Sequence, residues 1–334
     1  IKMRKLASIR EIKNIAPIAN ADAIELATVD GWEVVIKKDQ FKVGDKVVYF
    51  EIDSFLPIKP EFEFLRKSSY KKMGDEEGFR LRTIKLRGQI SQGLLIPVPE
   101  EYKNEPIGTD LTEALGVQKY EPPIPACLDG VIKGYMPSFI KKTDEERIQN
   151  LDDKFEIFKG LKFHVSEKLE GTSFTAYLKD GVFGVCGRNL EYLEDDDNSY
   201  WKVAKQLDLE NKLQSLGRNL AFQGEMIGEG IQKNIYKIKG QTVKFFNIYD
   251  IDAASYLEKN EFLNIIDQLG LDYVPVIEKD LDFGQFEDIQ DVLKYAEGHS
   301  KLYKTQREGV IFVANEDDKR YSFKVISNKY LAKH

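Results

Sequence analysis

The sequence predicts an α+β protein in which an N-terminal OB-like β-barrel precedes a larger domain of mixed strands and helices. Three observations support this fold class. Residues 1–110 contain short runs of β-branched and aromatic residues with few helical patterns. Residues 119–130 are rich in proline, which is typical of a linker. After this segment, helical and strand patterns alternate to the last residue.

Composition and charge exclude several classes of protein. The 334 residues carry a formal net charge of -7, which does not indicate binding of nucleic acid through overall charge. Two cysteines, Cys127 and Cys186, argue against a disulfide framework or cysteine-rich zinc sites and indicate a reducing, intracellular compartment, cytoplasm or nucleus. Three histidines leave little room for a histidine metal cluster. Because the sequence has no long apolar run and no signal peptide, we expect no membrane partner.

The first predicted domain, residues 1–118, consists of short strands. The stretch 31–57 alternates strand residues around a tight turn at Gly44, and the stretch 79–98 contains two more strands. Residues 20–29 ("NADAIELATV") fit a connecting turn or short helix. About five strands with few helices predict a compact, OB-like barrel. Its basic residues fit either a solvated barrel edge or an RNA-backbone contact: Arg80, Arg82, Lys85 and Arg87.

The second predicted domain, residues 131–334, alternates helices and strands. Thr143 and Glu146 have the spacing of a capping box at the start of a helix. Amphipathic helices are predicted over 199–217 and 254–270, each ending at a glycine, and a third over 286–300. Strand patterns occupy the intervening stretches 161–169, 173–188, 219–228, 242–251, 307–315 and 320–327.

The stretch "VSEKLEGTSF" (165–174) places Lys168 in what is otherwise the pattern of a buried strand. The turn residues Glu170 and Gly171 follow at once, which indicates a strand end that faces a cleft. By itself this pattern fits either an ordinary surface lysine or a nucleophile, because a short motif of this kind arises often by chance.

Five further segments follow in order, each on or at the end of a predicted strand: "CGRN" (186–189), "FQGEMIGEGIQKN" (222–234), "KFFNIYDI" (244–251), "REGVIFV" (307–313) and "SFKVISNKY" (322–330). Together with the first, they resemble motifs I, Ia, III, IIIa, IV and V of the covalent nucleotidyltransferases, a superfamily of DNA ligases, RNA ligases and mRNA capping enzymes. The resemblance covers about residues 145–334. "EKLEGTSF" and "GIQKN" are similar to the nick-sealing RNA ligases, and the barrel ahead of motif I resembles the Naegleria-type RNA ligases in particular.

This resemblance implies that residues 131–334 form a nucleotidyltransferase (ligase adenylation) domain of antiparallel sheets with flanking helices. It implies an ATP-dependent RNA ligase in which Lys168 is the nucleophile and carries AMP covalently. Lys324 would contact the α-phosphate, and Arg188 the ribose or the acceptor RNA end. Glu167 would receive the adenine amino group. Tyr249 would stack on the purine, with Phe246 as the alternative.

The resemblance also implies a divalent cation, Mg²⁺ or Mn²⁺. Glu170, Glu225 and Glu308 would hold it, mostly through water, because such cations bind carboxylates and keep several waters. Glu225 thereby belongs to the ATP site as well. Arg147, in "DEERIQN", would help to bind the β- and γ-phosphates. The expected partner is RNA with 3′-hydroxyl and 5′-phosphate ends, in a nicked duplex, and the expected state is a monomer.

Physical chemistry explains these residue types. A lysine amine attacks phosphorus only when it is neutral, and its ordinary pKa near 10.4 keeps it protonated at neutral pH. A nearby cation, helped by Lys324, would lower the pKa of Lys168. Phage nick-sealing enzymes have a second lysine in motif V at the place of Ile326, so either Lys329 substitutes or one lysine suffices.

Three alternatives stay open at this point. A DNA ligase and a GTP-using capping enzyme share the motifs, but they usually carry an OB domain after motif V, where only about ten residues follow Lys324. A non-catalytic RNA-binding module with a decayed transferase domain is the third. The intact set of Lys168, Glu225, Glu308 and Lys324 argues against it.

Overall fold

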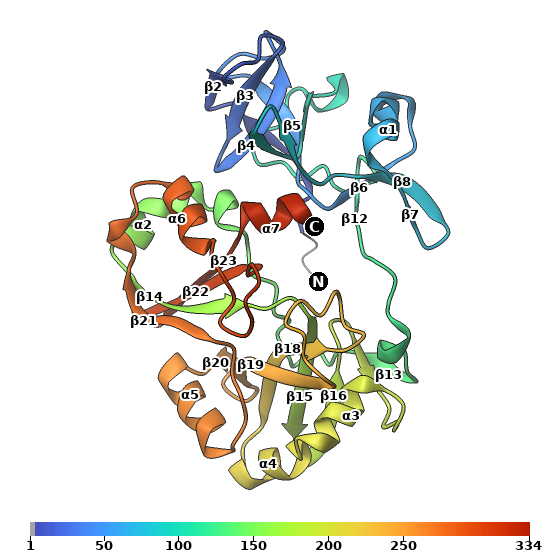
Figure 1. Ribbon diagram of the computed structural model, residues 1–334, viewed down its shortest axis with the longest axis vertical. Coiled ribbons are helices and arrows are strands. Elements are labelled where there is room, and N and C mark those ends of the chain that lie inside the picture. The colour runs from blue at the N-terminus through green and yellow to red at the C-terminus, as the bar shows by residue number, and fades with distance from the viewer. Residues whose placement is uncertain (1–3) are drawn as a thin grey trace.

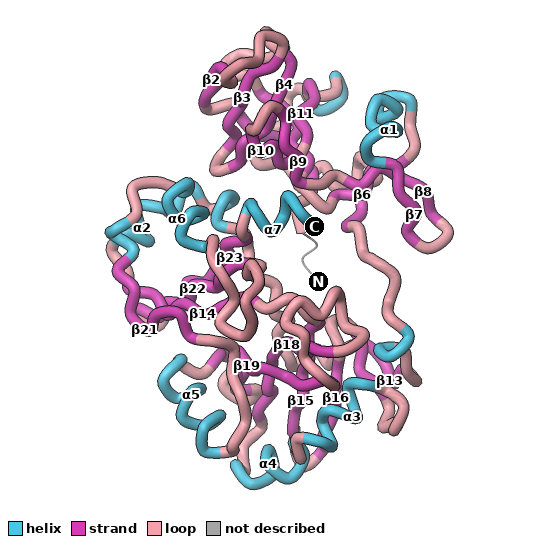
Figure 2. Tube along the Cα trace, in the orientation of Figure 1, coloured by secondary structure: helices cyan, strands magenta, loops and turns pink. Residues whose placement is uncertain are grey.

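The computed structural model describes residues 4–334 and contains two bodies arranged along its long axis (Figure 1, Figure 2). The N-terminal strands form the upper body, and the elements from β13 onward form the lower body. The C-terminal helix α7 (Asn328–Lys333) lies between them. Within residues 4–334, no helix has the length and apolarity needed to cross a membrane.

The upper body contains four small antiparallel sheets around two hydrophobic clusters. Strand β5 pairs with β1 on one side and β11 on the other. Because side chains alternate along a strand, Val48 and Phe50 enter one cluster while Val47 and Tyr49 enter the other. The elements are β1 (Ala7–Glu11), β2 (Asn14–Pro17), β3 (Ile24–Val29), β4 (Trp32–Lys37), β5 (Lys46–Phe50), β6 (Ser54–Pro57), η1 (Pro60–Leu65), α1 (Arg66–Ser69), β7 (Tyr70–Met73), β8 (Glu76–Arg80), β9 (Thr83–Leu86), β10 (Gln89–Gln92), β11 (Leu94–Pro97), η2 (Glu100–Tyr102) and β12 (Gln118–Lys119).

The expectation of a turn or helix over residues 20–29 was wrong. Residues Ile24–Val29 form β3, the middle strand of a sheet with β2 and β4. Ala27 and Val29 are buried in the barrel. Pairing on both sides, together with burial of one face, overrides the weak local preference of this stretch.

The proline-rich segment begins in the upper body and ends in the lower body. Tyr120 is buried, its backbone N–H donates to the carbonyl of Asp53 at 2.8 Å, and Arg80 lies over its ring at 4.4 Å. Leu128, in η3 (Ala126–Leu128), belongs to the core of the lower body. Residues 121–125 between them have no helix or strand.

The lower body contains a seven-stranded and a four-stranded antiparallel sheet, ordered β13-β17-β16-β15-β18-β19-β20 and β21-β14-β22-β23. Helices α3, α4 and α5 share a core with the larger sheet, and α2 and α6 with the smaller one. The strands are β13 (Ile132–Tyr135), β14 (Lys162–Lys168), β15 (Thr172–Lys179), β16 (Val182–Cys186), β17 (Leu190–Tyr192), β18 (Leu220–Gly228), β19 (Gln241–Asp250), β20 (Ser255–Tyr256), β21 (Val276–Asp282), β22 (Gly309–Glu316) and β23 (Lys319–Ile326). The helices are η4 (Ile148–Asn150), η5 (Asp152–Lys154), α2 (Phe155–Lys159), α3 (Ser199–Gln206), α4 (Leu209–Leu216), α5 (Lys259–Gln268), η6 (Phe283–Gln285) and α6 (Ile289–Ala296).

Two predicted helices differ in the structure. No capping box forms at Thr143, because the segment before η4 is extended and the carbonyl of Glu146 accepts the backbone N–H of Lys324 at 2.8 Å. The helix predicted over 199–217 is two helices, α3 and α4, separated at Asp208, whose φ of 52° is left-handed. As predicted, Gly217 ends the second one in the left-handed conformation.

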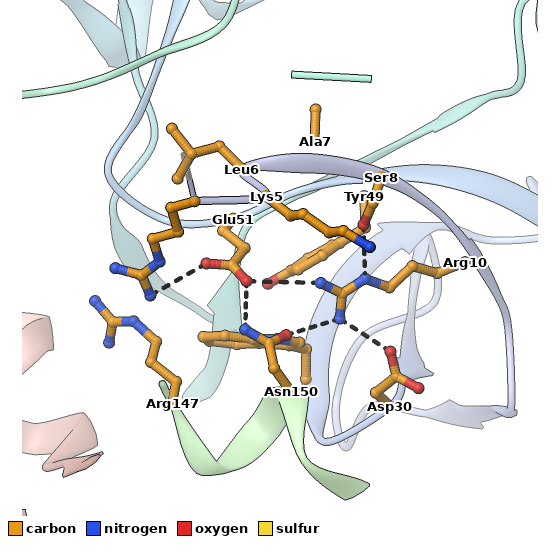
Figure 3. A network of polar contacts seen from close by, with 12 residues as sticks. Lys5, Leu6, Ala7, Ser8, Arg10, Asp30, Tyr49, Glu51, Arg147 and Asn150 are labelled. Atoms are coloured by element: carbon orange, nitrogen blue, oxygen red, sulfur yellow. Dashed lines mark hydrogen bonds and ion pairs between the residues drawn. The ribbon is translucent and has the colours of Figure 1, made fainter. Parts of the chain in front are cut away.

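A polar network joins the two bodies (Figure 3). The side-chain oxygen of Asn150 accepts from Nη1 of Arg10 and Nε1 of Trp32, both at 2.8 Å. Its Nδ2 donates to Glu51, and Arg10 also binds Asp30 at 2.9 Å. Since Asn150 belongs to the lower body and its partners to the barrel, this residue ties the barrel to the segment that precedes α2.

The turn between β3 and β4 docks closely on the same segment. The backbone N–H of Gly31 donates to the carbonyl of Gln149 at 2.9 Å. A Cβ atom at Gly31 would lie 2.8 Å from the Cα atom of Gln149, so only glycine permits this approach.

Candidate active site

A cavity of about 300 Å³ opens between the two sheets of the lower body. Its walls are formed by the ends of β14, β15, β18, β19, β22 and β23, together with residues 143–145. Six of the residues predicted from the sequence line it: Glu167, Lys168, Arg188, Glu225, Phe246 and Lys324.

Lys168 is the last residue of β14 and pairs with Gly309 of β22, so it stands next to Glu308. Its Nζ donates to Oε1 of Glu308 at 2.8 Å. Gly171 then allows β15 to return beside β18, because a Cβ atom there would lie 2.3 Å from the carbonyl oxygen of Met226. The pairing of Ser173 with Glu225 brings the second carboxylate to the same end of the cavity.

The charges at this end of the cavity are strongly coupled. Burial lowers the pKa of Lys168, but the carboxylates of Glu308 and Glu225 outweigh it, so the pKa is raised above its ordinary value. Burial raises the pKa of Glu225 to about 8, against the opposing effect of Lys168. In this state the lysine holds its proton within an ion pair.

These two carboxylates fit a hydrated divalent cation. Within residues 4–334, no group of three or more histidine, cysteine or acidic side chains is arranged to hold an ion directly. Glu225 and Glu308 nevertheless offer hard oxygen ligands beside the same amine, and ions such as Mg²⁺ retain several waters. The donor set is therefore suited to a contact made mostly through water.

Lys324 reaches the cavity from β23. Its Nζ lies 3.7 Å from Oδ1 of Asp144. Burial, followed by the charges of Arg147 and Arg4, lowers the pKa of Lys324 well below its usual range. Lys329, the alternative to the second lysine of motif V, does not line the cavity. Its side chain is exposed and pairs with Glu297 at 3.3 Å, away from the cavity.

Arg147 and Arg188 occupy different surroundings. Arg188 lines the cavity, and its Nη1 lies 3.8 Å from Oε1 of Glu121 in the connecting segment. Arg147 is buried behind the wall, with Nη2 3.8 Å from Oδ2 of Asp53 in the barrel. Its Nε and Nη1 have no hydrogen-bond partner among residues 4–334. Burial of this guanidinium lowers its pKa, and it adds positive charge beside Lys324.

Glu167 lines the cavity, but its carboxylate already has partners. Oε2 accepts from the hydroxyl of Ser300 and Oε1 from the backbone N–H of Lys301, both at 2.7 Å. Burial raises the pKa of Glu167, against the effect of these hydrogen bonds. The expected bond to adenine would therefore compete with the loop that contains Ser300.

The structure does not direct Glu170 into the cavity, contrary to the expectation of a metal contact. Oε2 accepts from the hydroxyl of Tyr330, and Oε1 accepts from the backbone N–H of Lys233 at 3.2 Å. The residue is only 7% exposed. Each oxygen of Glu170 therefore already has one protein partner.

The aromatic residue at the cavity is Phe246, and the preference for Tyr249 was wrong in this respect. The register between β18 and β19 shifts at Phe246, which forms a β-bulge. The bulge lets the neighbours Phe246 and Asn247 both line the cavity. Tyr249 instead lies in a separate cluster against Tyr256, at a ring distance of 5.1 Å.

The polar cavity residues that the sequence did not identify include Lys119, Asn247 and Lys259. Nζ of Lys259 donates to the carbonyl of Phe246 and, at 3.1 Å, to Oδ1 of Asn247. Burial, then the charge of Arg320, lowers the pKa of Lys259 to about 7. Lys119 comes from the barrel, and burial lowers its pKa to about 8. Asn247 lies inside the segment 244–251. No motif contains Lys119 or Lys259, because β12 and the start of α5 reach the cavity only in the folded chain.

This fold and site define a nucleotidyl-transfer enzyme, with a strand-end lysine between two carboxylates and a second lysine opposite. Family models agree: an OB-fold domain matches residues 6–98 and an RNA ligase matches residues 161–326. A comparison with curated proteins gave no match.

Solved structures of an RNA ligase from Naegleria gruberi match the whole chain. A mutant without ligand is 46% identical, with a TM-score of 0.94, and the match covers 100% of this chain and 99% of that one. A mutant with ATP and Mn, and the enzyme with PPi, each match at 46% identity and a TM-score of 0.94 over 99% of both chains. The chain belongs to the RNA ligase family.

Proposed function

We propose that this chain is an ATP-dependent RNA ligase that works in three steps. Nζ of Lys168 attacks the α-phosphate of ATP, a nitrogen–phosphorus bond forms, and pyrophosphate leaves. The AMP then passes to the 5′-phosphate of an RNA, which regenerates the lysine and gives an adenylated end. The adjacent 3′-hydroxyl attacks this end, the phosphodiester forms and AMP leaves. The covalent adduct divides one difficult condensation into easier displacements.

The observation that carries the proposal is the ion pair of Lys168, which lines the cavity, with Glu308, together with Glu225 on β18, which lines the same cavity. When a divalent cation binds these two carboxylates in place of the lysine ammonium group, the amine can release its proton. Glu225 and Glu308 would hold the waters of Mg²⁺ or Mn²⁺, with Glu170 contributing through water. When bound, the cation favours the neutral amine and offsets charge on the α-phosphate.

The other cavity residues support the binding of a nucleoside triphosphate. Phe246, which lines the cavity, would stack on the purine, and Lys259 donates to its backbone carbonyl. Lys324 and Arg188 would contact the α-phosphate and the ribose or RNA end. Arg147 does not line the cavity, so it would act on the highly charged pyrophosphate through its buried positive charge rather than by contact.

The nucleic-acid substrate is proposed from the family. The RNA ligase family supports RNA as the substrate. We propose further that this RNA has a 3′-hydroxyl and a 5′-phosphate in a nicked duplex and is bound by a monomer. Among the basic residues of the barrel, Arg80 binds Asp53 at 2.9 Å, so it serves the fold. Arg82, Lys85 and Arg87 are exposed and stay candidates for contact with the RNA backbone.

The decisive experiment is mass spectrometry of the intact protein and its peptides after incubation with ATP and Mn²⁺. We expect one added AMP, on Lys168, and none in Lys168→Ala. Lys162→Ala, an exposed lysine at the other end of β14, is the matched control and should be labelled fully. AMP on another residue, or full labelling of Lys168→Ala, would refute the assignment.

Two comparisons separate the alternatives. Equal labelling by GTP would favour a capping-type transferase, and preferential sealing of DNA nicks over RNA nicks would favour a DNA ligase. A protein that is never adenylated would favour the non-catalytic RNA-binding module.

A further inference from the structure

The C-terminal helix α7 contacts both the barrel and the turn that follows the nucleophile. It begins one residue after β23, and Ser327 caps it by accepting the backbone N–H of Tyr330 at 3.2 Å. The backbone N–H of Ser327 donates to the carbonyl of Glu308 at 2.8 Å, so the helix starts from the motif that pairs with Lys168. In Figure 1 this helix lies between the two bodies.

On one side, α7 holds the turn after Lys168. The hydroxyl of Tyr330 donates to Oε2 of Glu170. The backbone N–H of Glu170 donates to the hydroxyl of Tyr236 at 2.6 Å, so the turn is bound from two directions. Tyr330 also stacks on His334 at a ring distance of 4.3 Å. Both Glu170 and the turn are buried, and hydrogen bonds in such surroundings hold geometry firmly.

On the other side, α7 packs on the barrel. Leu331 joins the hydrophobic cluster that contains Trp32, Tyr49 and Leu95. The neighbouring residues of one short helix therefore contact the barrel core and the carboxylate of motif I. A displacement of the barrel would therefore move Glu170 through the one helical turn that contains Tyr330 and Leu331.

We propose that Tyr330 is a positioning residue for lysine adenylylation, and that α7 transmits the position of the barrel to the nucleophile. This inference rests on the proposed function. Tyr330 does not belong to the residues that line the cavity. Its loss should therefore slow the attack of Lys168 on bound ATP while the apparent KM for ATP changes little, because the lysine is misplaced but the nucleotide site is intact.

The test compares Tyr330→Phe, which keeps the ring and its stacking, with the unchanged chain in single-turnover formation of the AMP adduct. We expect a rate at saturating ATP about 10-fold lower, a KM within about 2-fold, and an unchanged melting temperature. Lys333→Ala, on the exposed side of the same helix, is the control and should match the unchanged chain. An equal rate for Tyr330→Phe overturns the inference.

A double-mutant cycle distinguishes positioning through Glu170 from a general effect on the fold. In the background of Glu170→Ala, which removes the acceptor of the Tyr330 hydroxyl, the further change Tyr330→Phe should cost less than about 2-fold. A full, independent 10-fold loss in that background would contradict the proposed route. Leu331→Ala, which weakens only the barrel contact, should lower the rate several-fold at saturating ATP, and an unchanged rate refutes transmission from the barrel.

The two proposals fail separately. If the unchanged chain forms no adduct on Lys168, the proposed ligase activity is wrong. If the unchanged chain forms the adduct, and Tyr330→Phe and Leu331→Ala form it at the same rate, the ligase assignment stands and the proposed role of α7 is wrong.

Discussion

Nζ of Lys168 lies 2.8 Å from Oε1 of Glu308, so the proposed nucleophile is ion-paired with a proposed cation-binding carboxylate. The pair raises the pKa of Lys168 against the effect of burial. An amine in this state cannot attack phosphorus. The same carboxylate that keeps the lysine protonated is the one that a divalent cation would occupy, so binding of the cation and release of the proton are coupled.

This coupling predicts a two-sided effect of Glu308→Gln. Removal of the charge frees Lys168, but it also removes a carboxylate from the cation. We expect Mn²⁺ to bind at least about 10-fold more weakly by calorimetry and adduct formation to slow by about 100-fold. Glu316→Gln, at the exposed end of the same strand, is the control. A faster reaction would mean that the ion pair alone limits the rate.

The pH dependence should follow the same pair. Because Glu308 and Glu225 raise the pKa of Lys168 against the effect of burial, the amine holds its proton at neutral pH without a cation. The adenylylation rate should therefore rise with pH from 6 to 9 at low Mn²⁺, and saturating Mn²⁺ should move the profile to lower pH. A profile that does not move with the concentration of Mn²⁺ would contradict the coupling.

The β-bulge predicts which aromatic residue binds the purine. Stacking of a base on an aromatic ring contributes about 1–3 kcal/mol. Phe246→Ala should raise the KM for ATP by about 5- to 100-fold, measured by adduct formation. Tyr249→Phe should leave KM unchanged, because its ring packs on Tyr256 outside the cavity. A raised KM for Tyr249→Phe with an unchanged KM for Phe246→Ala would instead support Tyr249, the residue preferred from the sequence motif.

The unpartnered nitrogens of Arg147 predict that this residue lowers the stability of the fold and raises the rate of adduct formation. A buried cation whose nearest carboxylate oxygen is 3.8 Å away is costly to the folded state. Arg147→Met should melt at an equal or higher temperature, yet form the adduct about 10- to 100-fold more slowly. A variant that is less stable and fully active would show that Arg147 serves only the fold.

His164 predicts a loss of stability in acid. Burial, then the charges of Lys259 and Lys279, lowers its pKa to about 4. In the unfolded chain this imidazole takes up a proton near pH 6.5. The contribution of His164 to the free energy of unfolding is therefore fully present above pH 6.5 and is lost as the pH drops towards 4. The loss is about 2 kcal/mol at pH 5.

Urea unfolding at pH 7.5 and pH 5 measures this effect. His164→Gln should show a smaller difference between the two pH values than the unchanged chain. His299→Gln, at an exposed loop position, should not reduce the difference. Equal pH dependence in all three proteins would assign the acid sensitivity to other groups.

The sequence by itself determined the order of the domains and most strands of the lower body, with β13, β17, β20 and β21 left unpredicted. It also singled out Lys168, Glu225, Glu308 and Lys324 as candidate site residues. These features depend on local pattern: periodic apolar residues, glycine turns and motifs whose spacing reflects contiguous strand ends. The predicted strands over 161–169, 219–228 and 307–315 correspond to β14, β18 and β22.

Only the tertiary structure decided which side chains face the cavity and which carboxylates are already engaged. A one-residue bulge at Phe246 puts Phe246 and Asn247 on the same face of β19, and an alternating pattern cannot reveal it. Glu170 and Glu167 acquire partners from Tyr330 and Ser300, each more than a hundred residues away. Such contacts arise when distant segments are packed together, so no local property of the chain specifies them.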